Sequence, residues 1–243
     1  MSTEARPAFY ALAPGRWRDY VTLLHPPYTL WHLSYVVMGA ALAPEWRPTR
    51  LAATLAAFFL AVGIGAHALD ELNGRPLSTG IADRTLGVLA SVSISAAVAI
   101  GIGGAIRYDL WLLAFVAVGA FVVCSYNLEL FDGRLHGDVA FALAWGAFPL
   151  LTAYFAAAER LRWEAFLAAL FAALSSYAQR RLSNPVRRLR RQVAAVSGTT
   201  ELKDGSREPI TRETLIAGNE AALRALSAAV VVLAVALVVV RAT

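Results

Sequence analysis

The sequence predicts an all-α fold, a polytopic transmembrane helical bundle of about seven spans. Hydrophobic residues make up 58% of the 243 residues and charged residues only 16%, whereas about a quarter of the residues in a soluble domain are charged. The apolar residues gather in long runs, and several of these runs contain no charged residue. Each run approaches the roughly 20 residues with which an α-helix crosses the hydrocarbon core of a bilayer.

Seven spans are expected, in order along the chain. They cover approximately residues 28–44, 51–69, 86–106, 110–128, 139–158, 164–179 and 216–240. The first span is short, but Pro26 and Pro27 precede it, and Tyr28 and Trp31 are typical of a membrane interface. The sixth span opens beside Trp163 and runs into a basic segment.

The chain divides into an N-terminal segment and a bundle. Residues 1–27 are expected to be cytoplasmic or interfacial, and residues 28–243 form the bundle, with a basic cytoplasmic loop at 180–215. When the 22 basic residues are assigned to alternate sides of the membrane, most of them share the side of the N-terminus. The positive-inside rule therefore predicts an integral, multi-pass protein of the cell membrane, with a cytoplasmic N-terminus and an outside C-terminus.

The basic loop raises the question of a nucleic-acid partner. The run from Arg187 to Arg191 contains four arginines, and such a run can neutralise phosphates of a nucleic acid. A basic run beside a membrane span more often sets the topology and contacts anionic lipid headgroups. We therefore expect membrane lipid as a partner and no nucleic acid.

A polar motif follows the second span. If that span stays helical, His67, Asp70 and Glu71 share one helix face. Two carboxylates suit Mg²⁺, which prefers oxygen ligands and often bridges to substrate phosphates. Asn73 adds an amide oxygen, and Arg75 can bind a phosphate directly. The alternative is a polar helix end with no chemical role.

A second polar loop follows the fourth span, at residues 126–138. Tyr126 ends the span, and Asp132, Arg134, His136 and Asp138 crowd the short connection to the fifth. This loop either completes a site for a cation and a phosphate or is a solvated turn. Because the polar loops lie on one predicted side of the membrane, they indicate a site that is reached from that side.

Several segments carry a family resemblance. They are His25-Pro-Pro-Tyr-Thr-Leu-Trp-His, then Met38-Gly-Ala-Ala-Leu, then Tyr126-Asn-Leu with its Gly-Arg loop, and finally the run from Phe141 to Tyr154. In this order they resemble the UbiA-type intramembrane prenyltransferase superfamily, over roughly residues 25–215. In that family, two Asp-rich motifs after helices two and six bind Mg²⁺ and an isoprenyl diphosphate. The isoprenyl group is then transferred to a lipophilic acceptor within the bundle.

The resemblance implies roles for particular residues. Asp70 is the one acid on the first family motif; with Glu71 it is expected to be catalytic and to bind Mg²⁺, and His67 replaces the first motif acid as a further metal ligand. The residues expected to bind the substrate are Asn73, Arg75, Tyr126, Arg134, Arg180 and Arg181. The second motif is missing, because residues 179–191 contain six arginines and no acid. These arginines are expected to hold the diphosphate instead.

Three hypotheses remain open. The first is a Mg²⁺-dependent prenyltransferase, in which aromatic side chains from the set Trp31, Tyr35, Trp145 and Tyr154 face the allylic cation. The second is a non-catalytic relative that binds an isoprenoid, a quinone or a lipid, which the missing motif favours. The third is a membrane metalloenzyme whose iron or zinc ligands come from His32, His67, His136, Asp70, Glu71 and Glu129.

Overall fold

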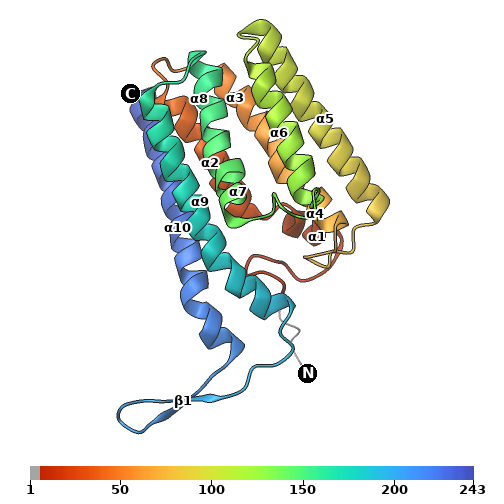
Figure 1. The fold of residues 1–243 in the computed structure, drawn as a ribbon, viewed down its shortest axis with the longest axis vertical. Coiled ribbons are helices and arrows are strands. Elements are labelled where there is room, and N and C mark those ends of the chain that lie inside the picture. The colour runs from red at the N-terminus through yellow and green to blue at the C-terminus, as the bar shows by residue number, and fades with distance from the viewer. Residues whose placement is uncertain (1–5) are drawn as a thin grey trace.

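The computed structural model describes residues 6–243, of which helices form the largest part (Figure 1). The elements along the chain are α1 (Arg16–Leu23), α2 (Pro26–Leu42), α3 (Pro48–Phe58), η1 (Phe59–Ala66), α4 (His67–Leu72), α5 (Asp83–Arg107), α6 (Leu112–Asn127), α7 (Asp138–Ala142), η2 (Leu143–Ala147), α8 (Phe148–Ala158), α9 (Trp163–Arg191), β1 (Thr199–Glu201), β2 (Arg207–Pro209) and α10 (Arg212–Ala242). The segments η1 and η2 are π-helical. They join their neighbours into two continuous helices, 48–72 and 138–158.

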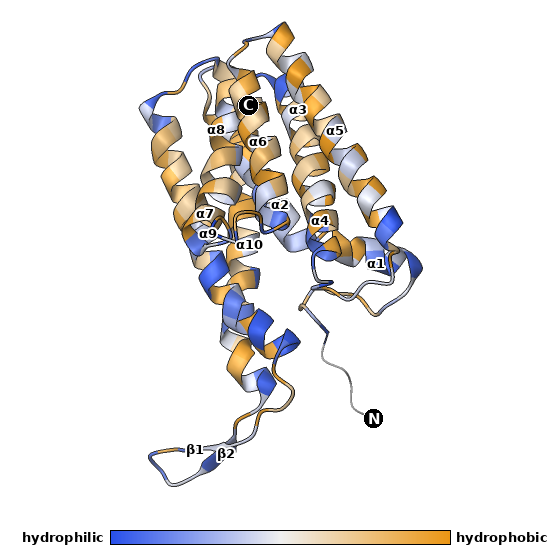
Figure 2. Ribbon diagram, turned by 45° about the vertical axis from the view of Figure 1, so that its right-hand side comes forward, coloured by the Kyte–Doolittle hydropathy of each residue, from blue (hydrophilic) through white to orange (hydrophobic). Residues whose placement is uncertain are grey.

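Four helices are long and apolar enough to cross a membrane: Pro48–Leu72, Asp83–Arg107, Asp138–Ala158 and Arg212–Ala242. Figure 2 shows hydrophobic residues along most of the bundle helices, whereas hydrophilic residues concentrate in α1, in the loops and in the basic half of α9. The prediction of a helical fold is confirmed, and the four helices are consistent with a membrane protein. Helix α6 is also apolar but has only 16 residues.

The segment 180–215, predicted as a basic loop, is only partly a loop. Helix α9 continues to Arg191 with Pro185 inside it, because Gln179, Ser183 and Val186 are buried at helical spacing and hold one face of the basic stretch against the protein. Beyond it, β1 and β2 form an exposed antiparallel hairpin. Figure 1 shows this hairpin extending past the rest of the molecule.

Helix α2 lies in the centre of one half of the bundle. Glycine at position 39 is required there, because a Cβ atom would lie 2.1 Å from the carbonyl oxygen of Leu150 in α8. This close approach of two backbones is typical of helices that pack through small residues. The core on that side joins α2, α8, α9 and α10, and it consists of Trp31, Tyr35, Met38, Leu150, Ala169, Ala172, Val230 and Ala234.

The other half of the bundle contains the helix 48–72, α5 and α6 (Figure 1). Its core, with Val62, Val123, Tyr126 and Trp145, joins η1, α6 and η2. At one end of the bundle, α4 and α6 end and α2 and α7 begin. The polar residues that the sequence singles out are at this end.

Candidate functional site

A polar cavity of about 470 Å³ lies at this end of the bundle. It is bounded by the start of α2, by α4, by the end of α6 and by the basic half of α9. Its polar and charged lining residues are Tyr10, His25, Tyr28, His32, His67, Asp70, Asn73, Tyr126, Asn127, Glu129, His136, Gln179, Arg180, Ser183, Asn184, Arg187, Arg188, Arg191 and Gln192. The motif after the second predicted span and the arginines after the sixth therefore meet in one cavity.

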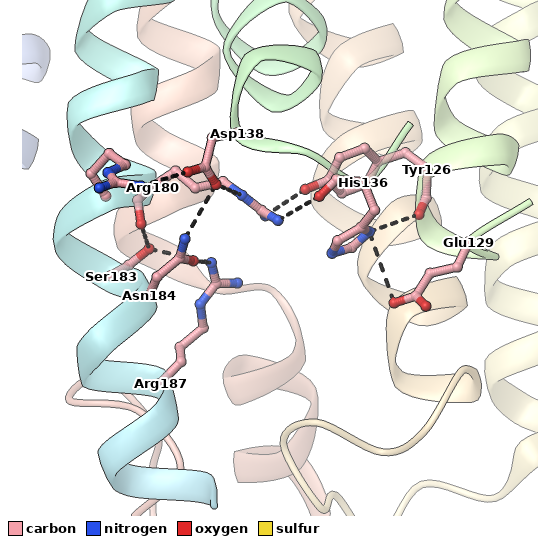
Figure 3. A network of polar contacts seen from close by, with 9 residues as sticks. Tyr126, Glu129, His136, Asp138, Arg180, Ser183, Asn184 and Arg187 are labelled. Atoms are coloured by element: carbon pink, nitrogen blue, oxygen red, sulfur yellow. Dashed lines mark hydrogen bonds and ion pairs between the residues drawn. The ribbon is translucent and has the colours of Figure 1, made fainter. Parts of the chain in front are cut away.

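Arg180 holds one wall of the polar cavity together (Figure 3). Its Nε donates to Oδ1 of Asp138 at 3.1 Å, and its Nη2 donates to the carbonyl oxygen of His136 at 2.8 Å. Its Nη1 donates to the hydroxyl oxygen of Tyr126. The side chain is 8% exposed, so these bonds fix α9 against α6 and α7, and the charge of Arg180 is already neutralised by Asp138.

The other arginines of the cavity differ from Arg180. The Nη2 of Arg187 donates to Oδ1 of Asn184 at 2.7 Å, which orients the guanidinium group (Figure 3). Within residues 6–243, Arg187, Arg188 and Arg191 form no ion pair. The cavity thus carries an excess of positive charge, and such a group of arginines is suited to bind a phosphate or diphosphate by charge-assisted hydrogen bonds.

Asp70 lies on the opposite wall, at the end of α4. Its carboxylate forms no ion pair within the described part of the chain. Next to it, Nδ2 of Asn73 donates to the carbonyl oxygen of Asn127 at 3.2 Å, which joins the loop after α4 to the end of α6. Asp70 and Asn73 therefore lie at the cavity, as the sequence predicts.

Glu71 does not lie at the cavity, although it was expected to share a site with Asp70. Its side chain is 0% exposed, and its oxygens accept hydrogen bonds from the backbone N–H of Leu77 at 3.0 Å and of Thr79 at 2.7 Å. The hydroxyl of Thr79 donates a third bond at 2.9 Å. These bonds organise the turn after α4, so the geometry gives Glu71 a structural role.

We expect Glu71→Gln to destabilise the protein and to leave any dependence on Mg²⁺ unchanged. A glutamine has one acceptor oxygen in place of two, so at least one buried N–H loses its partner, which costs about 1–3 kcal/mol. Thermal unfolding in detergent measures the loss of stability. A change in the Mg²⁺ concentration needed for half-maximal activity, with unchanged stability, would return Glu71 to the metal site.

Three arginines predicted to bind the substrate lie outside the polar cavity. Arg75 donates from Nη1 to the carbonyl oxygens of Thr79 and Ile81 and pairs with Asp83, so it stabilises the same turn as Glu71. Arg134 is exposed. Arg181 is also exposed and contacts Asp138 at 3.3 Å. Of the six predicted substrate-binding residues, Asn73, Tyr126 and Arg180 line the cavity.

All four histidines of the chain line the polar cavity. His25 has a left-handed backbone, with φ of 45°, and its ring lies 4.1 Å from that of His67, edge to face. Its Nε2 is buried without a hydrogen-bond partner within residues 6–243. Burial, and next the neighbouring His67, lower the pKa of His25 well below its usual value, so its ring is neutral at pH 7.

The cavity does not hold a preformed metal cluster. Across residues 6–243, no three or more His, Cys, Asp or Glu side chains are grouped so that they could bind a metal ion. The three predicted metal ligands do not converge, because Glu71 is used in its turn and does not line the cavity. The third hypothesis, a His and carboxylate metalloenzyme, therefore has no supporting ligand group.

An apolar pocket adjoins the polar cavity. It has a volume of about 130 Å³ and lies between the helix 48–72, α5, α6 and the helix 138–158. Val62 and Trp145 line both the pocket and the cavity. A basic cavity beside an apolar pocket suits an amphiphilic ligand with an anionic head and a hydrophobic tail.

Among protein-family models, curated proteins and solved structures, none matches this chain. Its function is therefore inferred from the site itself.

Proposed function

We propose that this chain is a prenyltransferase of the UbiA type, which moves an isoprenyl group from its diphosphate to a lipophilic acceptor within the membrane. One observation carries the proposal: the basic polar cavity and the apolar pocket lie side by side, with Val62 and Trp145 in the lining of both. An isoprenyl diphosphate has the matching chemistry, with a charged head at one end and a hydrocarbon chain at the other.

The arginines without an ion pair bind the diphosphate. Arg187, Arg188 and Arg191 line the cavity from α9, and a guanidinium group offers several N–H donors in a fixed geometry that matches phosphate oxygens. Arg180 supports them from its place between Asp138 and Tyr126. In place of the missing second Asp-rich motif, these arginines contact the phosphate oxygens directly.

Mg²⁺ fits here only as an ion shared with the substrate. Asp70 would supply one carboxylate, and diphosphate oxygens and water would supply the other ligands, an arrangement that is common for Mg²⁺. The bound ion would add positive charge next to the departing diphosphate.

The residues of the cavity stabilise the charges that develop in the reaction. The bond between the allylic carbon and the diphosphate oxygen breaks, its electron pair leaves with the diphosphate, and the arginines stabilise this leaving group. The allylic carbon then bonds to the acceptor, which loses a proton. Trp145 lies where the cavity meets the pocket, and its ring face is suited to stabilise the allylic cation. Trp31, Tyr35 and Tyr154 line neither the cavity nor the pocket and pack only in the core.

The membrane arrangement belongs to the same proposal. In addition to the four long apolar helices, α2, α6 and the first part of α9 cross the bilayer, which gives about seven spans in a cell membrane. The polar cavity and the basic half of α9 face the cytoplasm, together with the N-terminus, and the C-terminus lies outside. This orientation follows the excess of basic residues on one side.

A second function remains a candidate: a non-catalytic protein that binds an isoprenoid, a quinone or another lipid. The observation that favours it is the scarcity of metal ligands at the cavity. Asp70 forms no ion pair there, Glu129 contacts His136 at 3.9 Å, and no three-ligand metal group is found within residues 6–243. Such a protein would bind the amphiphile in the same cavity and pocket and release no pyrophosphate.

The test uses the full chain in detergent or lipid nanodiscs. Geranylgeranyl diphosphate is added with Mg²⁺ and a membrane lipid extract as the source of acceptor, and both binding and pyrophosphate release are measured. We expect saturable binding and Mg²⁺-dependent release. Binding without release would support the non-catalytic function, and the absence of both would overturn the proposal.

A further inference from the structure

We propose that Arg50 closes the far end of the apolar pocket and thereby limits the length of the isoprenyl chain that the protein accepts. This inference rests on the proposed function, because it takes the apolar pocket as the site of the isoprenyl tail. It adds a residue that determines specificity, at the end of the bundle opposite the polar cavity.

The apolar pocket follows the helix 48–72 from the polar cavity to the opposite end. Val62 lines it where it meets the cavity, and Arg50 lines it at the other end. Twelve residues separate the two positions, which corresponds to about 18 Å along a helix at ~1.5 Å per residue. Tyr108, in the turn between α5 and α6, also lines the far end.

Arg50 is held firmly in this position. Its Nη1 lies 2.7 Å from Oε1 of Glu159 and donates to the carbonyl oxygen of Ala156 at 3.0 Å. The guanidinium carbon lies 4.0 Å from the centre of the Tyr108 ring. The side chain is only 13% exposed, so Arg50 ties the start of α3 to the end of α8 and to the turn after α5.

A longer hydrocarbon chain would have to displace this arginine. Moving Arg50 would break its bond to Glu159 and leave the carbonyl oxygen of Ala156 without this donor, next to an apolar chain. Partly buried charged groups lose their partners only at a high cost in free energy. The polar contacts of Arg50 therefore make a rigid end wall.

Gly104 and Gly103 provide a matched test of this end wall. Gly104 lines the far part of the pocket, and a Cβ there would meet only Leu112, at 3.8 Å. Gly103, its neighbour in α5, is exposed and has nothing within 4 Å of a Cβ. We expect Gly104→Leu to shorten the pocket. Gly103→Leu adds the same side chain at a position outside the pocket and should leave its length unchanged.

The measurement is the affinity for geranyl, farnesyl and geranylgeranyl diphosphate, with the full chain in detergent. In Gly104→Leu we expect the affinity for geranylgeranyl diphosphate to fall about tenfold or more relative to geranyl diphosphate, that is by ~1.4 kcal/mol or more. In Gly103→Leu the order of affinities stays that of the wild type. Arg50→Ala opens the end wall and shifts the preference toward the longest chain, and Arg50→Lys restores part of the limit.

Each outcome decides one of the two proposals. If wild-type protein binds none of these diphosphates, the proposed function fails. If it binds them and the chain-length preference is the same in the wild type, Gly104→Leu and Arg50→Ala, only the role of Arg50 is overturned. An equal loss of affinity for all three chains in Gly104→Leu contradicts that role too, because a shortened pocket should weaken the binding of the longest chain most. Should Arg50→Ala fail to fold, the comparison of Gly104→Leu with Gly103→Leu still decides.

Discussion

Asp70→Asn removes pyrophosphate release while the protein still binds geranylgeranyl diphosphate. Asparagine keeps the shape of the side chain and loses the negative charge with which Asp70 would hold a shared Mg²⁺ on its wall of the polar cavity. Loss of a residue that only hydrogen-bonds to a metal ligand costs about 10–100-fold in metal affinity or activity. Asp70 would be a metal ligand itself, so we expect a fall of about a hundredfold or more in kcat. The measurement is pyrophosphate release over a Mg²⁺ titration, together with the affinity for the diphosphate.

Asp132→Asn is the matched control for this variant. Asp132 is exposed in the loop after α6 and does not line the cavity, and its left-handed backbone, with φ of 57°, suits asparagine. The control should retain wild-type kcat and Mg²⁺ dependence. If Asp70→Asn retains them as well, Asp70 has no part in catalysis, and the remaining case for metal at this site is lost.

The positions of the long apolar helices could be predicted from the sequence to within a few residues, apart from the end of α9. The charge-free run 86–106 became α5 at Asp83–Arg107, and the run 139–158 became the helix Asp138–Ala158. The reason is physical, because a long apolar segment must satisfy its backbone hydrogen bonds within itself, and a helix does so. The ends follow from the first charged residues on each side.

The basic stretch after the sixth predicted span was harder to predict. Arginine is compatible with a helix and with a loop, and Pro185 argues against a helix interior. Tertiary packing decides that this stretch is helical, since it packs against α7 and lines the polar cavity. The local sequence does not predict that contact.

Convergence of the site could be predicted, but the direction of its side chains could not. Asp70 and Arg180 both follow the end of a predicted span on the same predicted side of the membrane. A common cavity could therefore be expected from the topology. Glu71 is only one position from Asp70, and successive residues of an α-helix point about 100° apart, so one faces the cavity and the other is buried in the turn. Helix rotation of this kind is set by the packing of the bundle and is not readable from one sequence.

His25, a residue of the cavity, was missed in the sequence, and Arg134 was wrongly placed at the site. His25 belongs to no polar motif, yet it faces His67 across the start of α2. The sequence did contain a signal for His25. The chain has only four histidines, and each lies in a loop or within about two turns of a span end on the predicted cytoplasmic side. Arg134 was overrated because the left-handed residues Phe131 and Asp132 turn its loop outward, and loop geometry of this kind has no periodic pattern.

Arg187→Gln is expected to weaken the binding of isoprenyl diphosphates and to leave the binding of uncharged isoprenoid alcohols unchanged. Arg187 lines the polar cavity, has no ion-pair partner within residues 6–243, and is oriented by Asn184 at 2.7 Å. Its charge is therefore available for a ligand. A hydrogen bond to a charged group contributes about 1.5–3 kcal/mol, so the affinity for geranylgeranyl diphosphate should fall roughly 10–100-fold.

Arg181→Gln makes the same change on the same helix, at an exposed position outside the cavity. Its affinity for the diphosphate should match the wild type, and so should that of Arg187→Gln for geranylgeraniol, which has the tail without the charge. Because each lost arginine removes one charge contact, the binding of the diphosphate by Arg187→Gln should also depend less steeply on salt concentration. Equal losses in both arginine variants would mean that the arginines act only through the general positive field of α9. Equal losses for the diphosphate and the alcohol would mean that Arg187 shapes the cavity and does not bind the head group.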